Sequence, residues 1–126
     1  MRWYELNPGR FEIERRLLAR FHPGAKLIIK KRRMRVVLEV ITDIDIYLVE
    51  GVFADDHPYS SMRVYVTEPR LRGSPPHMFG DGELCLHDGS VGPETTAKVY
   101  LDWAKQWLLA YERWREGERW PRAYQG

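Results

Sequence analysis

The single cysteine of this chain, Cys85, is the residue best equipped for covalent chemistry. A thiolate is a strong nucleophile, and a loop can present it to a second molecule where a core cannot. Residues 73–82, shortly before the cysteine, hold two prolines and three glycines and show no helical or alternating apolar pattern. That composition is typical of a loop. We therefore interpret Cys85 as a candidate nucleophile carried by a loop.

An isolated cysteine also has a simpler interpretation as a small apolar core residue. Leu84 and Leu86 flank Cys85 and fit that interpretation, which composition alone favours. The loop setting favours chemistry instead, because loops on a rigid scaffold carry function more often than cores do.

The elements before this loop are predicted from capping residues and β-branched stretches. Asn7 and Pro8 are typical of a helix start, and the apolar positions after them predict a helix over about residues 8–21, which His22-Pro23-Gly24 ends. Four strands are predicted, over about residues 27–31, 35–41, 46–53 and 62–66. Their short connections favour an antiparallel meander, since parallel neighbours need long crossovers.

The second half of the chain is predicted to be a long loop followed by the longest helix. His57, before the last strand, is interpreted as a turn residue held by Pro58 and not as a catalytic histidine. No periodicity follows the last strand until about Pro93, where a proline and then an acidic residue are typical of a helix start. Gly117 is placed to end this helix. Its aromatic stripe is expected to pack on the sheet and consists of Tyr100, Trp103, Trp107, Tyr111 and Trp114.

Composition indicates one globular domain over residues 1–126. Apolar residues make up 44% of the chain and charged residues 30%, which is the balance of a folded protein with a single core. One cysteine excludes an internal disulfide and a cysteine-based zinc site, so we expect no metal and a reducing, cytoplasmic setting. No apolar run is long enough to span a membrane, and no membrane partner is expected.

The charge distribution and the motifs of the sequence argue against nucleic acid and cofactors as ligands. The net charge is only +2, and the basic residues of 26–35, which no stacking aromatic interrupts, are interpreted as a solvated hairpin and not as a nucleic-acid site. The chain has no Gly-x-Gly-x-x-Gly sequence or other phosphate loop, so no cofactor is expected and any adenylation must happen elsewhere.

The order of elements and the local sequences resemble the ubiquitin-conjugating enzymes. Gly82-Glu83-Leu84-Cys85-Leu86 is similar to the segment around the reactive cysteine of that family, and His57-Pro58-Tyr59 stands in the turn before the preceding strand. His77 occupies the position where the eukaryotic enzymes carry an asparagine, and the tryptophan usual after the cysteine is missing. These departures resemble the bacterial branch, the conjugating component of short type II CBASS anti-phage systems.

The resemblance implies a fold, a reaction and partners. The fold would be α+β and ubiquitin-conjugating-enzyme-like: an N-terminal helix, a four-stranded antiparallel meander, a long cysteine-bearing loop and a long C-terminal helix. Cys85 would take an acyl group as a thioester and pass it to an amine. The donor would be the C-terminus of a cyclic-nucleotide synthase, which is a nucleotidyltransferase, or of a ubiquitin-like protein, with a separate activating enzyme if one is needed.

Three polar residues are candidates to assist this reaction. His77 is expected either to hydrogen-bond the oxyanion or accept a proton from the amine, or to serve only as a structural loop histidine; the sequence does not separate these roles. His87 and Asp88, just after Cys85, are substrate-binding candidates that would orient or deprotonate a lysine, although loop residues of this kind are more often simply solvated.

Other function classes stay open at this stage. An inactive conjugating-fold relative would act as a binding module that scaffolds a partner protein, although such relatives generally lack the cysteine. The basic run of residues 26–35 would suit an anionic surface. A cysteine protease would use His77 as its base, but no third residue is evident to orient that histidine.

Overall fold

The computed structural model describes residues 1–121 and has an α+β architecture. In chain order the elements are α1 (Trp3–Leu6), α2 (Pro8–Phe21), β1 (Lys26–Lys30), β2 (Arg33–Ile41), β3 (Ile46–Val52), β4 (Arg63–Glu68) and α3 (Ala97–Arg115). The strands form one antiparallel sheet in the order β1-β2-β3-β4. The predicted meander and the predicted helix before it are therefore confirmed, with element ends shifted by no more than a few residues.

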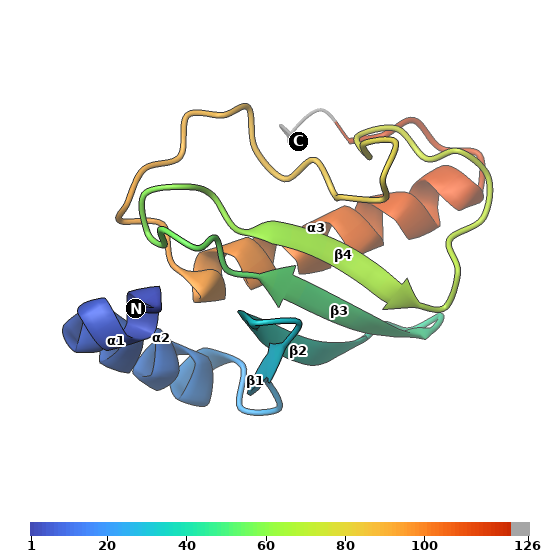
Figure 1. Cartoon of the computed structure of the whole chain (residues 1–126). Coiled ribbons are helices and arrows are strands. Elements are labelled where there is room, and N and C mark those ends of the chain that lie inside the picture. The colour runs from blue at the N-terminus through green and yellow to red at the C-terminus, as the bar shows by residue number, and fades with distance from the viewer. Residues whose placement is uncertain (122–126) are drawn as a thin grey trace.

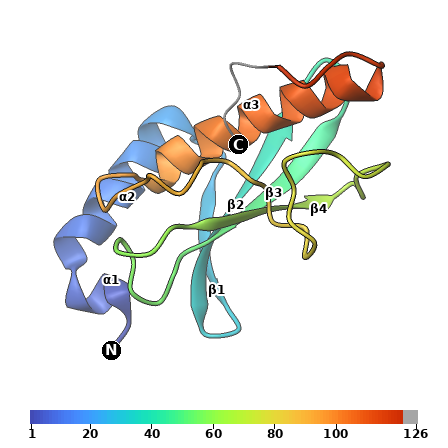
Figure 2. The ribbon, with the colours of Figure 1, turned by 90° about the horizontal axis from the view of Figure 1, so that it is seen from above.

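One face of the sheet is covered by helices. Along β2 the buried side chains alternate with more exposed ones, as expected for a strand with one face in a core. The buried set belongs to the same apolar core as the inner face of α3. Figures 1 and 2 show α3 running across this face with α2 beside it. The sheet thus packs under α3, and the outer edge of β4 is not paired with another strand of the sheet.

The aromatic stripe of α3 belongs mainly to this core. Tyr100, Trp107 and Tyr111 are buried, as predicted, and Trp103 and Trp114 are half-buried beside them. The predicted start of the helix is wrong by several residues. Thr96 is the N-cap, so Pro93 and Glu94 lie outside the helix. Arg10 of α2 holds the carbonyls of Pro93 and Thr95 in this segment instead.

The short helix α1 is absent from the sequence-based prediction. Glu5 accepts a hydrogen bond from the Arg2 amide at 3.0 Å and closes the first turn. A helix of four residues is too short to show an apolar period. Its one buried residue, Trp3, packs against Phe53 and His57 at ring-centroid distances of 5.1 Å and 4.5 Å.

The basic hairpin is solvated, as predicted. Lys31 and Arg32 form its turn with positive φ angles, and both are exposed. Arg35 is half-buried because it pairs with Glu50 across the sheet at 2.8 Å. Among residues 1–121 no helix is both long and apolar enough to cross a membrane.

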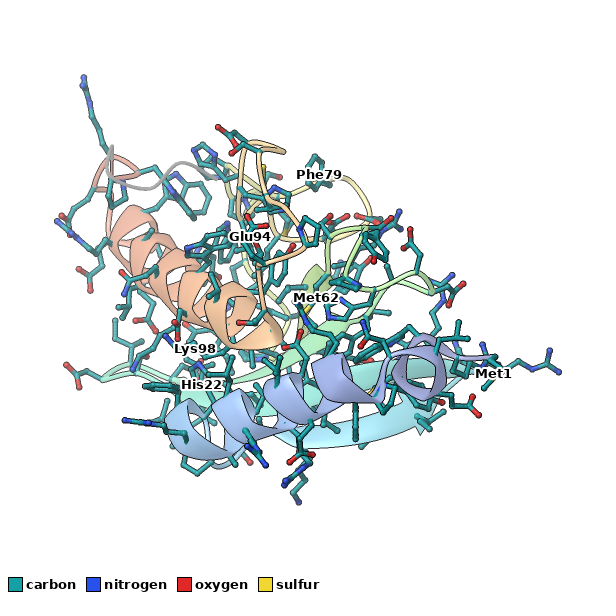
Figure 3. All side chains as sticks on the ribbon, turned by 90° about the vertical axis from the view of Figure 1, so that its left-hand side faces the viewer. Met1, His22, Met62, Phe79, Glu94 and Lys98 are labelled. Atoms are coloured by element: carbon teal, nitrogen blue, oxygen red, sulfur yellow. The ribbon has the colours of Figure 1, made fainter. Side chains whose placement is uncertain are left out.

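The C-terminal end of α2 is tied to α3 by charged side chains. His22 caps α2, and its Nε2 lies 2.8 Å from Oδ1 of Asp102. Lys98 reaches the other oxygen of the same carboxylate at 2.6 Å. Figure 3 shows His22 and Lys98 at this junction.

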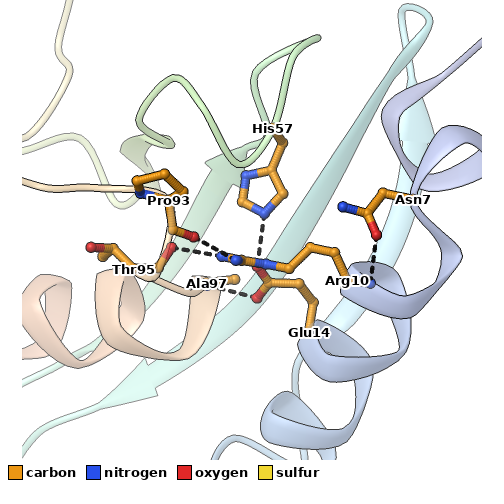
Figure 4. A network of polar contacts seen from close by, with 7 residues as sticks. All are labelled: Asn7, Arg10, Glu14, His57, Pro93, Thr95 and Ala97. Carbon is orange, nitrogen blue, oxygen red and sulfur yellow. Dashed lines mark hydrogen bonds and ion pairs between the residues drawn. The ribbon is translucent and has the colours of Figure 1, made fainter.

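A buried carboxylate in the middle of α2, Glu14, joins this helix to α3 and to the turn after β3 (Figure 4). Its side chain is fully buried. One oxygen accepts the Ala97 amide at 2.8 Å, and the other accepts Nε of Arg10 at 2.9 Å and Nε2 of His57 at 2.7 Å. The His57–Pro58 bond is cis. The predicted turn histidine is therefore also a buried partner of α2, which its place in a polar turn did not indicate.

Arg10 extends this network to the segment before α3. Its guanidinium donates to the carbonyl of Pro93 and, at 3.0 Å, to that of Thr95. Burial by itself raises the pKa of Glu14, but hydrogen bonds from His57, the Ala97 amide and Arg10 together lower the pKa below its usual value. The carboxylate therefore stays ionised inside the protein.

We expect Glu14→Gln to lower the free energy of unfolding at pH 7 by about 3 kcal/mol, because the variant leaves the positive charge of Arg10 without its buried counter-ion. A folded-state pKa below the unfolded one stabilises above the unfolded pKa, and this contribution is lost as pH falls through the folded pKa. The difference between wild type and variant should therefore shrink below about pH 4. Urea unfolding followed by tryptophan fluorescence measures both effects.

Glu12→Gln is the matched control on the same helix. Glu12 forms only surface pairs with Arg15 and Arg16, so its loss should cost less than about 1 kcal/mol. Equal losses in the two variants would contradict the central role of Glu14.

Candidate active site

The cysteine segment is held against the free edge of β4. The Leu84 amide donates to the Val64 carbonyl at 2.8 Å, and Tyr65 and Glu83 form an isolated antiparallel bridge. Within residues 69–96 there is no helix and no further strand of the sheet. The pairing with β4 nevertheless gives residues 83–85 an extended course, which sets the direction of their side chains.

The alternation of side chains decides where Cys85 lies. Leu84 and Leu86 are 2% and 7% exposed and enter the core. In an extended chain the residue between them points the opposite way. Cys85 is half-buried and lies outside the core cluster. The flanking leucines are therefore core residues, and the cysteine between them is not.

Cys85 lines a cleft of about 510 Å³, here named the cysteine cleft. Its other lining residues are Ser61, Arg63, Phe79, Glu83, Leu84, Leu86, His87, Asp88 and Gly89. Phe79 is 52% exposed and extends from the loop at the rim (Figure 3). The thiol is thus placed where a second molecule can approach it.

The electrostatic setting keeps this thiol neutral. Burial raises the pKa of Cys85, and the nearby Glu83 carboxylate raises it further. The Sγ atom lies 3.9 Å from the His87 carbonyl, a weak contact for a thiol donor. A reactive thiolate is favoured by a lowered pKa, and the structure shows the opposite direction for Cys85.

His77 positions Cys85 through its backbone. Its carbonyl accepts the Cys85 amide and Nε1 of Trp107, each at 2.9 Å. His77 has a φ of 58°, a left-handed conformation that few residues other than glycine adopt. Its ring lies 5.3 Å from that of Trp120, which also packs on Trp107 at 5.2 Å. The backbone of His77 therefore fastens the cysteine segment to α3, and the chemical role of the imidazole stays a prediction.

His87 and Asp88 both line the cysteine cleft but are engaged locally. Nδ1 of His87 accepts the Gly89 amide at 3.0 Å, and its ring lies 6.0 Å from Tyr100. Burial lowers the pKa of His87. Asp88 accepts from both the amide and the hydroxyl of Ser90, which lowers its pKa. His87 is therefore favoured as a neutral ring and Asp88 as a weak base.

Glu83 is the cleft residue that the sequence analysis missed. It lies two positions before Cys85, and in an extended segment that spacing puts both side chains on one side. Burial raises the pKa of Glu83, Arg63 lowers it and Asp81 raises it, with a net rise. The alternating pattern of residues 83–86 was the signal that could have identified it.

The described residues include no evident set of side chains that could bind a metal ion together. Among residues 1–121 no group of three or more His, Cys, Asp or Glu side chains is placed to hold a metal ion.

A comparison with protein families matches most of the chain. A family model described as E2-CBASS, type II CBASS E2 protein, matches residues 14–125, which is most of the chain. No curated protein and no solved structure matches the chain significantly.

We expect the alkylation rate of Cys85 by iodoacetamide to rise with pH to a midpoint above about 8.5, the value of an ordinary thiol. The thiolate is the species that reacts, so the midpoint reports the raised pKa. Mass spectrometry of the full chain follows the reaction, and Cys85→Ser gives the background. A midpoint below about 8 would show that a cationic group dominates the site instead.

Proposed function

The chain belongs to the type II CBASS E2 proteins, and from this membership we propose that it is a conjugating enzyme that carries an acyl group on Cys85. The family gives the protein a role in CBASS anti-phage systems. The reaction we propose is formation of a thioester at Cys85 and transfer of the acyl group to an amine. We propose further that residues 1–126 form a single ubiquitin-conjugating-enzyme-like domain in the cytoplasm.

One observation carries the proposal. The extended segment on β4 turns Leu84 and Leu86 into the core and leaves Cys85 at the wall of a cleft. A cysteine kept only for packing would be expected to point the other way. The fold proposal draws on the same features, which are a helix, an antiparallel meander, an irregular cysteine segment and a final helix.

The first chemical step is attack on an activated carbonyl. The Cys85 thiol loses its proton to solvent or to a base, and its sulfur forms a bond to the carbonyl carbon. The bond to the activating group then breaks, and that group leaves with its electron pair. Because the Cys85 amide already donates to His77, the oxyanion needs other donors. The imidazole of His77 is the candidate on this chain.

The partners follow from the need for an activated carboxyl group. We propose that the acyl donor is the C-terminus of a cyclic-nucleotide synthase or of a ubiquitin-like protein encoded with this chain. The sequence offers no phosphate loop for ATP, so a separate activating enzyme would supply the energy of the thioester.

We expect an adduct between the chain and its acyl donor when both are incubated with ATP and the activating partner. The wild-type adduct should be cleaved by excess thiol, because a thioester exchanges with thiols. Cys85→Ser should give an adduct that resists thiol but not hydroxide, and Cys85→Ala should give none. Denaturing gels with and without thiol distinguish the three, and absence of any wild-type adduct would reject the reaction.

A second candidate is an inactive conjugating-fold module that scaffolds a partner protein. The raised pKa of the Cys85 thiol favours it, since such a thiol is largely protonated at neutral pH. Phage challenge of cells carrying the complete operon separates the two functions. Full protection with Cys85→Ala would support the scaffold, and lost protection with a normally folded variant would support the enzyme.

A further inference from the structure

Glu83 shares one side of the cysteine segment with Cys85. The bridge between Glu83 and Tyr65 fixes the extended backbone at this point. Leu84, which lies between Glu83 and Cys85 in the sequence, is buried on the opposite side. Residues two apart in such a segment lie roughly 7 Å apart on one side. Both side chains line the cysteine cleft.

We propose that Glu83 is the proton acceptor for the amine that attacks the acyl group on Cys85, so that this part of the cleft receives a primary ammonium such as a lysine side chain. The inference rests on the proposed function and names the group that the transfer step requires. A lysine is protonated at neutral pH and cannot attack until it loses a proton.

The surroundings of Glu83 suit this task. The ionisable groups around it are Arg63 and Tyr65 on β4, Asp81 in the preceding turn, and Cys85, His87 and Asp88 on its own segment. Burial makes the half-buried carboxylate a stronger base than an ordinary glutamate, although Arg63 partly offsets this effect. An incoming ammonium would meet a negative charge that is poorly hydrated.

The two other acidic residues nearby are occupied. Oδ1 of Asp88 already accepts two hydrogen bonds from Ser90. Oδ1 of Asp81 accepts the Glu83 amide at 3.0 Å, and Asp81 does not line the cleft. Glu83 is therefore the carboxylate best placed for the acceptor amine.

Transfer of the acyl group from Cys85 to the amine conserves atoms and charge. Glu83 takes one proton from the ammonium, and the nitrogen lone pair forms a bond to the thioester carbonyl carbon. The carbon–sulfur bond breaks, and sulfur leaves with its electron pair. The second proton on nitrogen passes to that sulfur, and Glu83 returns its proton to solvent. Once protonated, Glu83 no longer repels the departing thiolate of Cys85.

The test uses the full chain loaded by thiol exchange with a synthetic peptide thioester of mercaptoethanesulfonate, which needs no activating enzyme. Loaded wild type and Glu83→Gln are mixed with free lysine, and discharge is followed by mass spectrometry from pH 6.5 to pH 9. We expect Glu83→Gln to slow lysine discharge about 100-fold near pH 7 and less at higher pH, where free amine forms without help. Alkylation of unloaded Cys85 should become roughly threefold faster in this variant, because a repelling charge is gone.

Two controls separate a chemical role from a structural one. Hydroxylamine is mostly neutral at these pH values and needs no proton acceptor before it attacks, so its discharge rate should be the same in both proteins. Glu12→Gln removes an equal charge from the surface of α2, outside the cleft, and should leave lysine discharge unchanged. A loaded Glu83→Gln that discharges to lysine at the wild-type rate would overturn the inference alone. Failure of wild type to load would overturn the proposed function and this inference with it.

Discussion

The ionised carboxylate of Glu14 is the interaction on which the arrangement of this protein depends. It lies out of contact with water and joins α2, the first amide of α3 and the turn that carries His57. A buried charge is tolerated only when donors surround it, and each donor here comes from a different part of the chain. The start of α3 and the turn before β4 are therefore fixed relative to α2, and β4 in turn holds the cysteine segment.

Most of the fold could be predicted from local patterns in the sequence. Alternation predicted the strands, and capping residues predicted α2 almost to the residue. The start of α3 was misplaced because Pro93 is held by Arg10 from another helix, and no local rule contains that contact. For the same reason the burial of His57 was missed: its partner lies far away in the sequence.

The candidate site was predictable in part. Cys85 stood out by its residue type and His77 by its place in a family pattern, but the backbone contact that joins them has no signature in the sequence. The pKa of Cys85 is raised by burial and by the nearby Glu83 carboxylate, and both effects become visible only in the structure. An environment that disfavours the thiolate makes sulfur a poorer leaving group. Under the proposed function, such a site would hold an acyl group longer before water removes it.

The shared carbonyl of His77 has a mechanical consequence. A carbonyl oxygen has two lone pairs, and here the indole of α3 and the amide of the reactive cysteine each take one. The positions of the Trp107 indole and of the Cys85 amide are therefore coupled through this one oxygen atom.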